Sequence, residues 1–217
     1  MSISQRARLA VLLGLVACLP VSAVAAHAPS VDRGNPTTAA TALVLTDPTL
    51  SRAIGATISA PGEVDWYRMD LKAGDPILVD MTAPDATGTL AATFTLLGPG
   101  LPDAAGVSDW AASLASEAGV TGAVAFTPDP DPVRQVHGGL GFIQYGSISL
   151  SAPADGSYYV AVQAVDPMAT GKYVLAPGVR EEFGPDVVGG MADLVAFFTA
   201  AWPAASAAPS ASAAPAG

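Results

Sequence analysis

The sequence predicts an all-β protein: an antiparallel, jelly-roll-like β-sandwich with a short inserted helix or loop and a C-terminal helix. Three observations indicate this class. Segments in which apolar and polar residues alternate recur along the chain, turns rich in Gly, Pro and Asp separate them at intervals of roughly 8–12 residues, and the 217 residues include 22 Gly and 19 Pro. Alternation is typical of half-buried strands, because successive side chains point to opposite faces of the sheet.

The chain starts with the pattern of a secretory signal peptide over residues 1–25. Arg6 and Arg8 precede an apolar run at residues 9–19, and small residues follow. A run of this length is too short for a stable membrane anchor but suits a cleaved leader. We therefore expect a protein that is secreted or located in the periplasm or cell envelope, with residues 26–36 as a flexible lead-in.

Cys18 is the only cysteine in the sequence, so no disulfide within the chain can support the fold. Residues 15–18 (Leu-Val-Ala-Cys) also resemble a lipobox, the signal for lipidation of a new N-terminal cysteine. Leu19, Pro20 and Val21 follow the cysteine where a polar tether would be expected. We favour ordinary cleavage and keep membrane attachment through a lipidated Cys18 as the alternative.

The β-sandwich domain is predicted over residues 37–180. Residues 37–45 predict an edge strand, residues 53–60 predict a second strand with alternate apolar side chains, and residues 90–97 predict a later strand that ends at Gly98-Pro99-Gly100.

The most informative strand is the one predicted at Val64–Leu71. Its side chains divide between two faces, with Tyr67, Met69 and Leu71 on one and Trp66, Arg68 and Asp70 on the other. We expect the first, more apolar face to be in the core. A four-residue turn at 72–75 leads to a strand that begins at Pro76, and this spacing predicts a β-hairpin.

Residues 101–122 interrupt the β pattern and predict an inserted helix or ordered loop. Ser108 is a suitable N-cap for a short helix that places Trp110 and Leu114 on one side. The alternation then returns in three predicted strands, at residues 143–150, 157–165 and 172–176.

The C-terminal part has a different composition. Residues 186–202 are apolar and helix-like, within a predicted C-terminal segment at 181–202, and include Asp193. The segment is short for a membrane span. We favour a helix that packs on the domain or on a partner, with membrane attachment as the alternative. Residues 203–217 contain only Pro, Ala, Ser and Gly, which predicts a disordered tail.

Four segments in this order resemble the bacterial pre-peptidase C-terminal (PPC) domain family: Gly55–Ile58, Gly62–Gly74, Ala154–Val162 and Thr170–Leu175. The resemblance covers residues 37–176. It implies a jelly-roll-like β-sandwich of the kind found on exported enzymes and surface proteins, where it serves secretion, substrate adhesion or stability. Some members bind calcium or extracellular polymers. The resemblance therefore implies a surface polymer or another envelope protein as the partner.

Charge and composition exclude several functions. The chain has 19 acidic and 9 basic residues, so it lacks the basic surface that nucleic-acid binding requires. It has only two histidines and no Gly-x-Ser-x-Gly motif, and no serine has an evident base beside it. These absences argue against a hydrolase.

Trp66 and Arg68 are the candidate binding residues, because they share one face of a strand. If exposed, they could stack on a sugar or on a partner protein. The alternative, which we favour, is that the insertion or the C-terminal helix covers Trp66, since large exposed aromatic side chains are uncommon without a partner.

Four aspartates are calcium candidates, because calcium prefers several oxygen ligands on flexible loops. They are Asp129, Asp131, Asp155 and Asp166. Asp is also a common turn residue, since its carboxylate accepts nearby backbone N–H groups. We favour the turn interpretation, expect no required cofactor, and keep calcium as a metal to test.

The rival hypothesis is a copper-dependent oxidoreductase. Cleavage after Ala26 would make His27 the N-terminal residue, whose amine and imidazole could bind copper together with His137. Such a histidine brace would resemble the copper site of lytic polysaccharide monooxygenases. Cleavage after Ala25 would abolish it.

The sequence thus favours a non-enzymatic, exported β-sandwich module for binding, adhesion or anchoring. A purely structural envelope protein held by its C-terminal helix is a further alternative.

Overall fold

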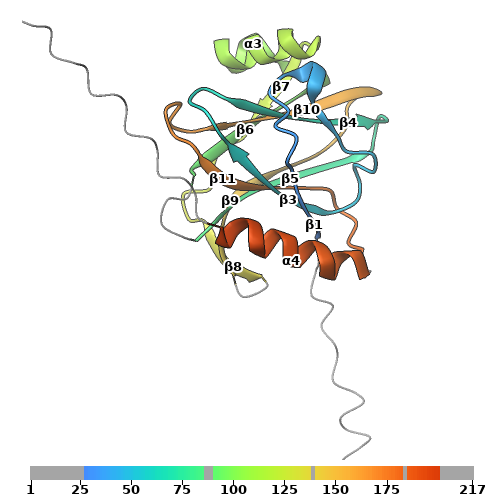
Figure 1. The fold of residues 1–217 in the computed structure, drawn as a ribbon. Coiled ribbons are helices and arrows are strands. Elements are labelled where there is room, and N and C mark those ends of the chain that lie inside the picture. The colour runs from blue at the N-terminus through green and yellow to red at the C-terminus, as the bar shows by residue number, and fades with distance from the viewer. Residues whose placement is uncertain (1–26, 86–89, 138–139, 183–184, 201–217) are drawn as a thin grey trace, which may run out of the picture.

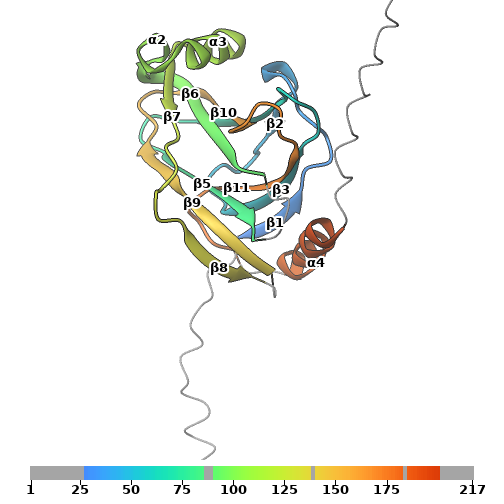
Figure 2. The same ribbon diagram turned by 90° about the vertical axis from the view of Figure 1, so that its left-hand side faces the viewer.

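The fold consists of two β-sheets packed face to face, with helices on the outer face of each (Figures 1 and 2). The predicted all-β sandwich is therefore confirmed. The computed structural model describes residues 27–85, 90–137, 140–182 and 185–200. The predicted signal peptide, including Cys18, and the predicted tail at 203–217 lie outside the described residues.

Sheet A has the strand order β1-β3-β11-β5-β9-β8. The bounds of these strands are β1 Ala28–Val31, β3 Arg52–Ile58, β11 Gly171–Pro177, β5 Pro76–Pro84, β9 Leu140–Ser151 and β8 Val133–His137. Sheet B has the order β2-β4-β10-β6-β7. Its bounds are β2 Leu43–Val44, β4 Val64–Leu71, β10 Gly156–Ala164, β6 Ala92–Asp103 and β7 Gly122–Ala125. The helices are η1 (a 3₁₀ turn) Ala39–Thr41, α2 Ala104–Val107, α3 Asp109–Ala118 and α4 Pro185–Thr199.

The core lies between the inner faces of the two sheets and is lined as the alternation predicts. Tyr67, Met69 and Leu71 of β4 are buried there. Ile77 of β5 and Ile58 of β3 face them from sheet A and are almost completely buried. Burial of this apolar surface is the main stabilising contribution in a chain whose only cysteine is Cys18.

The predicted hairpin between β4 and β5 is wrong. β4 pairs with β10 in sheet B, whereas β5 pairs with β9 and β11 in sheet A. The turn at 72–75 therefore carries the chain from one sheet to the other. An alternating strand on each side of a short turn is expected both for a hairpin and for such a crossing, so the pattern alone cannot distinguish them.

The predicted flexible lead-in at 26–36 is also wrong in part, because residues 28–31 form β1. The N–H of Ala28 donates to the carbonyl of Ser51 at 2.8 Å, and that of Asp32 donates to Gly55 at 2.9 Å. β1 pairs in parallel with β3, and β2 pairs in parallel with β4. The sandwich is therefore antiparallel except at one edge strand of each sheet. A strand of only four residues that includes Pro29 has too little alternation to be recognised.

β6 continues through Gly98-Pro99-Gly100, where the sequence predicts its end. The register of β6 with β7 shifts between Gly98 and Asp103, so these residues form an irregularity within the strand. Gly98 is required by packing, since a Cβ atom there would lie 2.2 Å from the ring of Tyr158. The Tyr158 hydroxyl donates to the carbonyl of Pro99 or Ala154, each at 2.9 Å, and thereby fixes this corner.

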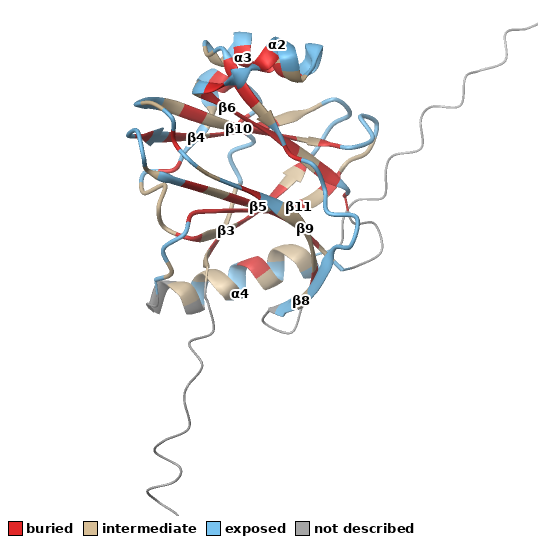
Figure 3. Ribbon diagram, turned by 180° about the vertical axis from the view of Figure 1, so that it is seen from behind, coloured by how far each residue is buried: buried red, intermediate tan, exposed pale blue. Residues whose placement is uncertain are grey.

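Helix α4 lies on the outer face of sheet A (Figures 1 and 3). The side chains of Leu194 and Phe197 lie over Gly55, where an added Cβ atom would be 2.7 Å from Leu194. Lys172 of β11 donates its Nζ hydrogens to the carbonyls of Phe197 (2.5 Å) and Ala200 (2.8 Å). A cation at this end of a helix satisfies free carbonyls and interacts favourably with the helix dipole. Among the described residues no helix is both long and apolar enough to cross a membrane.

We predict that Lys172→Met loosens α4 without unfolding the sandwich. The substitution keeps an apolar stem but removes both hydrogen bonds to the helix, which should cost about 1 kcal/mol. Hydrogen exchange should become faster in residues 190–199 and stay unchanged in β4 and β10. Lys72→Met, which removes an exposed lysine paired with Asp155, is the control. Unchanged protection of α4 in Lys172→Met would contradict this role.

Candidate functional site

A groove beside helix α3 is the strongest candidate site. The hydroxyl of Ser108 accepts the N–H of Ala111 at 3.0 Å and caps α3, as the sequence predicts. The helix packs through Ala111, Leu114 and Ala115 on the outer face of sheet B (Figure 3). Because these residues face the sheet, another side of α3 lies next to the turn between β3 and β4.

Two adjoining cavities form this groove, which we call the Trp110 groove. The first has a volume of about 440 Å³ and is lined by Thr37, Ala60, Pro61, Gly62, Glu63, Val64, Trp66, Trp110, Ser113, Leu114 and Glu117. The second has a volume of about 370 Å³ and is lined by Gly62, Glu63, Trp110, Gln163, Ala164, Val165 and Pro167. Gly62, Glu63 and Trp110 belong to both cavities, so Trp110 stands at their junction.

Trp110 is unusual because it is large, apolar and 43% exposed. It shares one side of α3 with Leu114 and Glu117, at the i, i+4 and i+7 positions of a helix. Val165 (59% exposed) and Met168 (71% exposed) lie in the turn that borders the second cavity. The groove therefore has an aromatic centre and an apolar rim.

The carboxylates of Glu63 and Glu117 are the ionisable groups that line the groove. Glu117 Oε1 accepts the N–H of Ala39 at 3.0 Å, and Glu63 Oε2 accepts the N–H of Ala60 at 3.0 Å. These bonds hold both acidic side chains in place. No lysine, arginine or histidine lines either cavity in the part of the chain that the structure describes.

A buried acidic network lies next to the groove, on the inner side of β4. Tyr173 donates its hydroxyl hydrogen to Asp65 Oδ2 at 2.7 Å, and Tyr67 lies 2.8 Å from the Tyr173 hydroxyl, to which it donates. Asp65 is 1% exposed. The pKa of Asp65 is raised to about 7, chiefly because the carboxyl is buried; the hydrogen bond from Tyr173 lowers it, and the nearby carboxylates of Glu63 and Asp32 raise it.

The unsatisfied oxygens of this network indicate where the proton lies. Asp65 Oδ1 and Glu63 Oε1 are buried and have no donor among the described residues. The nearby carboxylate of Glu63 raises the pKa of Asp65, because it favours the protonated form. A proton on Asp65 satisfies both oxygens, whereas two negative carboxylates would repel each other in a region of low dielectric constant. The network thus favours a neutral Asp65.

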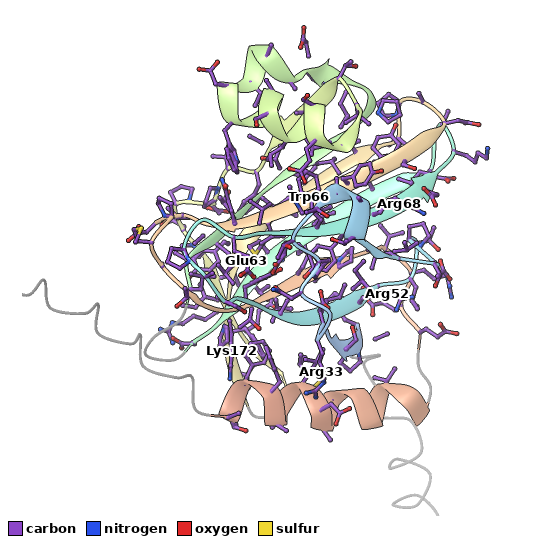
Figure 4. The ribbon with its side chains drawn as sticks, turned by 45° about the horizontal axis from the view of Figure 1, so that its top comes forward. Arg33, Arg52, Glu63, Trp66, Arg68 and Lys172 are labelled. Atoms are coloured by element: carbon purple, nitrogen blue, oxygen red, sulfur yellow. The ribbon has the colours of Figure 1, made fainter. Side chains whose placement is uncertain are left out.

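The structure places the two predicted binding residues on the outer face of sheet B, as the alternation of β4 requires (Figure 4). Trp66 is completely buried beneath the insertion, packed edge-on against Tyr159 with ring centroids 6.2 Å apart. Arg68 is half-buried and donates to Asp70 at 3.3 Å. Trp66 is thus part of a second small core and cannot be an exposed contact residue. The favoured alternative, that the insertion covers it, describes this structure.

The four aspartates proposed for calcium lie in three different connections between strands: Asp129 and Asp131 share the loop between β7 and β8, Asp155 lies between β9 and β10, and Asp166 lies between β10 and β11. Asp129 and Asp166 each accept the backbone N–H two residues later, at 2.9 Å. Asp155 accepts the N–H of Ala73 at 2.9 Å. These are the contacts expected of aspartates in turns, which is the alternative to calcium binding. Within the described ranges, no group of three or more His, Cys, Asp or Glu residues could hold a metal ion.

The two histidines of the copper hypothesis are at opposite edges of sheet A. His27 precedes β1 at one edge, and His137 ends β8 at the other. His27 Nδ1 lies 2.5 Å from the hydroxyl of Ser51, so the ring nitrogen that a histidine brace requires already has a hydrogen-bond partner. The fold does not bring these two residues together in one site.

Trp110 is the groove residue that the sequence does not single out as a candidate for binding. The N-cap at Ser108 placed it on the helix, but its exposure depends on which side of α3 packs on sheet B. Ala111 and Ala115 are the signal that could have shown this, because small residues let the helix approach the sheet closely and leave Trp110 at the margin.

Comparisons with known proteins identify no family. No family model matches the chain, and no curated protein matches it in sequence. Among solved structures, it is similar to PliG of Salmonella Typhimurium, a periplasmic inhibitor of g-type lysozyme, with 18% identity, a TM-score of 0.35, and coverage of 64% of this chain and 97% of PliG. It is also similar to CorA, a surface-associated copper-binding protein important for copper acquisition in Methylomicrobium album BG8. That match has 11% identity, a TM-score of 0.31, and coverage of 64% of this chain and 98% of CorA. At these TM-scores neither similarity supports an inference about function.

We predict that Asp65 makes the protein less stable as pH rises from about 4 to about 7. Below about pH 4 the carboxyl is protonated in both the folded and the unfolded state. Above it the unfolded chain, with an ordinary pKa of 3.8, releases the proton that the folded protein retains up to about pH 7. This difference should lower the free energy of unfolding by about 2–4 kcal/mol over that range.

Asp65→Asn removes this titration while keeping an acceptor for Tyr173. Urea unfolding between pH 4 and 8 should show a flatter pH dependence for Asp65→Asn than for the wild type. The control Asp131→Asn changes an exposed aspartate and should retain the wild-type slope. An Asp65→Asn variant whose stability falls as steeply as the wild type's would refute the neutral carboxyl.

Proposed function

We propose that this chain is a non-enzymatic, exported binding module that acts at the cell envelope or outside the cell, and that the Trp110 groove is its binding surface. One observation carries the proposal: a tryptophan with 43% of its surface exposed stands at the junction of cavities of about 440 and 370 Å³. Soluble proteins seldom expose large aromatic groups in hollows unless a partner covers them.

The support beneath Trp110 suits binding. Three buried small or apolar residues of α3 fix the helix on sheet B, so the backbone that carries the indole ring is already ordered when a partner arrives. Tryptophan is enriched among the residues that dominate binding energy, because it buries a large area with few rotatable bonds. An aromatic side chain on a helix that is fixed in this way is thus an efficient anchor for a ligand.

The leader pattern and the PPC-like segments support export. The first 25 residues have the pattern of a secretory signal peptide, and domains that the sequence resembles are carried by exported proteins. A surface polymer or another envelope protein remains the proposed class of partner, with no required cofactor.

The surroundings of Ser51, whose hydroxyl contacts His27, support the proposal that the protein is not an enzyme. Ser51 is 1% exposed, so a substrate cannot reach its hydroxyl. Glu181 lies 4.0 Å from His27 Nδ1, the same nitrogen that contacts Ser51. A catalytic triad requires the carboxylate and the nucleophile on different ring nitrogens. This cluster therefore lacks the geometry of an activated serine.

We expect Trp110→Ala to abolish most ligand binding while leaving the fold intact. The mature protein would be tested by isothermal titration calorimetry against purified cell-wall glycans, neutral oligosaccharides and peptides of defined charge. For each ligand that binds, the loss of the indole should weaken affinity about 10- to 100-fold, as for a central interface tryptophan. Val136→Ala, which truncates an apolar side chain that is 75% exposed on β8, is the matched control. Equal affinities for wild type and Trp110→Ala would refute the groove as the binding surface.

A further inference from the structure

The ionisable side chains that line the Trp110 groove carry charge of one sign. Glu63 and Glu117 line the cavities, and Asp109 and Asp166 are exposed beside Trp110 and Val165. The whole chain has a net charge of −10. Such a surface repels anionic polymers and attracts positively charged ligands, most strongly at low ionic strength.

The aromatic centre of the groove favours the same charge. The face of an indole ring attracts ammonium and guanidinium groups, and tryptophan is the strongest of the aromatic side chains in this respect. Trp110 presents an exposed ring on the side of α3 that also carries Glu117. A lysine or arginine side chain over Trp110 would contact the ring with its apolar stem and place its charge near the carboxylate.

The rim favours a polypeptide. Val165 is exposed and lines the second cavity, and the exposed Met168 follows in the same turn. Methionine adapts to irregular apolar protein surfaces.

We infer that the Trp110 groove binds a basic segment of a partner protein, with a lysine or arginine side chain stacked on Trp110 and apolar side chains against Val165 and Met168. This inference rests on the proposed function and specifies the class of its partner. The acidic groups set the charge of the ligand, and the exposed apolar rim distinguishes a peptide from a cationic sugar polymer.

The test uses three probes on the mature protein: a 12-residue peptide of alternating arginine and leucine, the same peptide with glutamate for arginine, and a neutral hexamer of N-acetylglucosamine. Affinities are measured at low and high NaCl concentration. We expect binding of the arginine peptide alone, at least 10-fold weaker at high salt. Trp110→Ala should weaken it at least 10-fold.

Glu117→Gln tests the negative charge of Glu117 separately from its hydrogen bond, because the amide oxygen can still accept the N–H of Ala39. It should weaken binding of the arginine peptide about threefold and reduce its salt dependence. Asp70→Asn is the matched control, since it removes an exposed charge at the far end of β4, roughly 20 Å from Glu63 along the strand. That variant should bind as the wild type does.

The outcomes separate this inference from the proposed function. Binding of the sugar hexamer or the glutamate peptide that is lost in Trp110→Ala, without binding of the arginine peptide, would overturn the basic partner and leave the groove as a binding surface. Binding of the arginine peptide that Trp110→Ala does not weaken would overturn both. No binding of the arginine peptide at low salt would overturn the inference alone.

Discussion

The packing of α3 on the outer face of sheet B is the contact on which the candidate site depends. Trp66 fills the space between the helix and the sheet and is completely buried, while Ala111 and Ala115 allow close approach. This second core fixes the position and rotation of α3 on the sheet. As a result, Trp110 is exposed at the edge of the contact between helix and sheet. The proposed binding surface therefore depends on the buried Trp66 of β4, which supports α3, and not on exposure of Trp66 itself.

The two outer faces of the sandwich are covered in different ways. On sheet B, a short capped helix leaves a groove with acidic walls, whereas on sheet A, α4 lies against Gly55 and is held at its end by Lys172. The buried network of Asp65, Tyr67 and Tyr173 joins the two sheets, because β4 belongs to sheet B and β11 to sheet A. A neutral Asp65 lets this network stay in a dry region, where an unpaired charge would be costly.

Much of the fold could be predicted from the sequence, because alternation determines which residues face the core. The positions of β4, β5 and β10, the buried set of Tyr67, Met69 and Leu71, and the cap at Ser108 follow from local patterns. Partner choice between strands does not, since the turn at 72–75 fits a hairpin as well as a crossing between sheets. The candidate site was less predictable, because exposure of Trp110 and burial of Trp66 depend on contacts between α3 and sheet B that no local pattern contains.

We propose that a ligand contacts Trp110 while Trp66 remains buried beneath α3. The most direct measurement follows the indole N–H signals of these two tryptophans by NMR, assigned through Trp110→Phe, while the arginine–leucine peptide is added. The structure predicts slow hydrogen exchange for Trp66, fast exchange for Trp110 in the free protein, and a saturable shift of the Trp110 signal on binding. An unshifted Trp110 signal at saturation, or rapid exchange of Trp66 in the free protein, would contradict it.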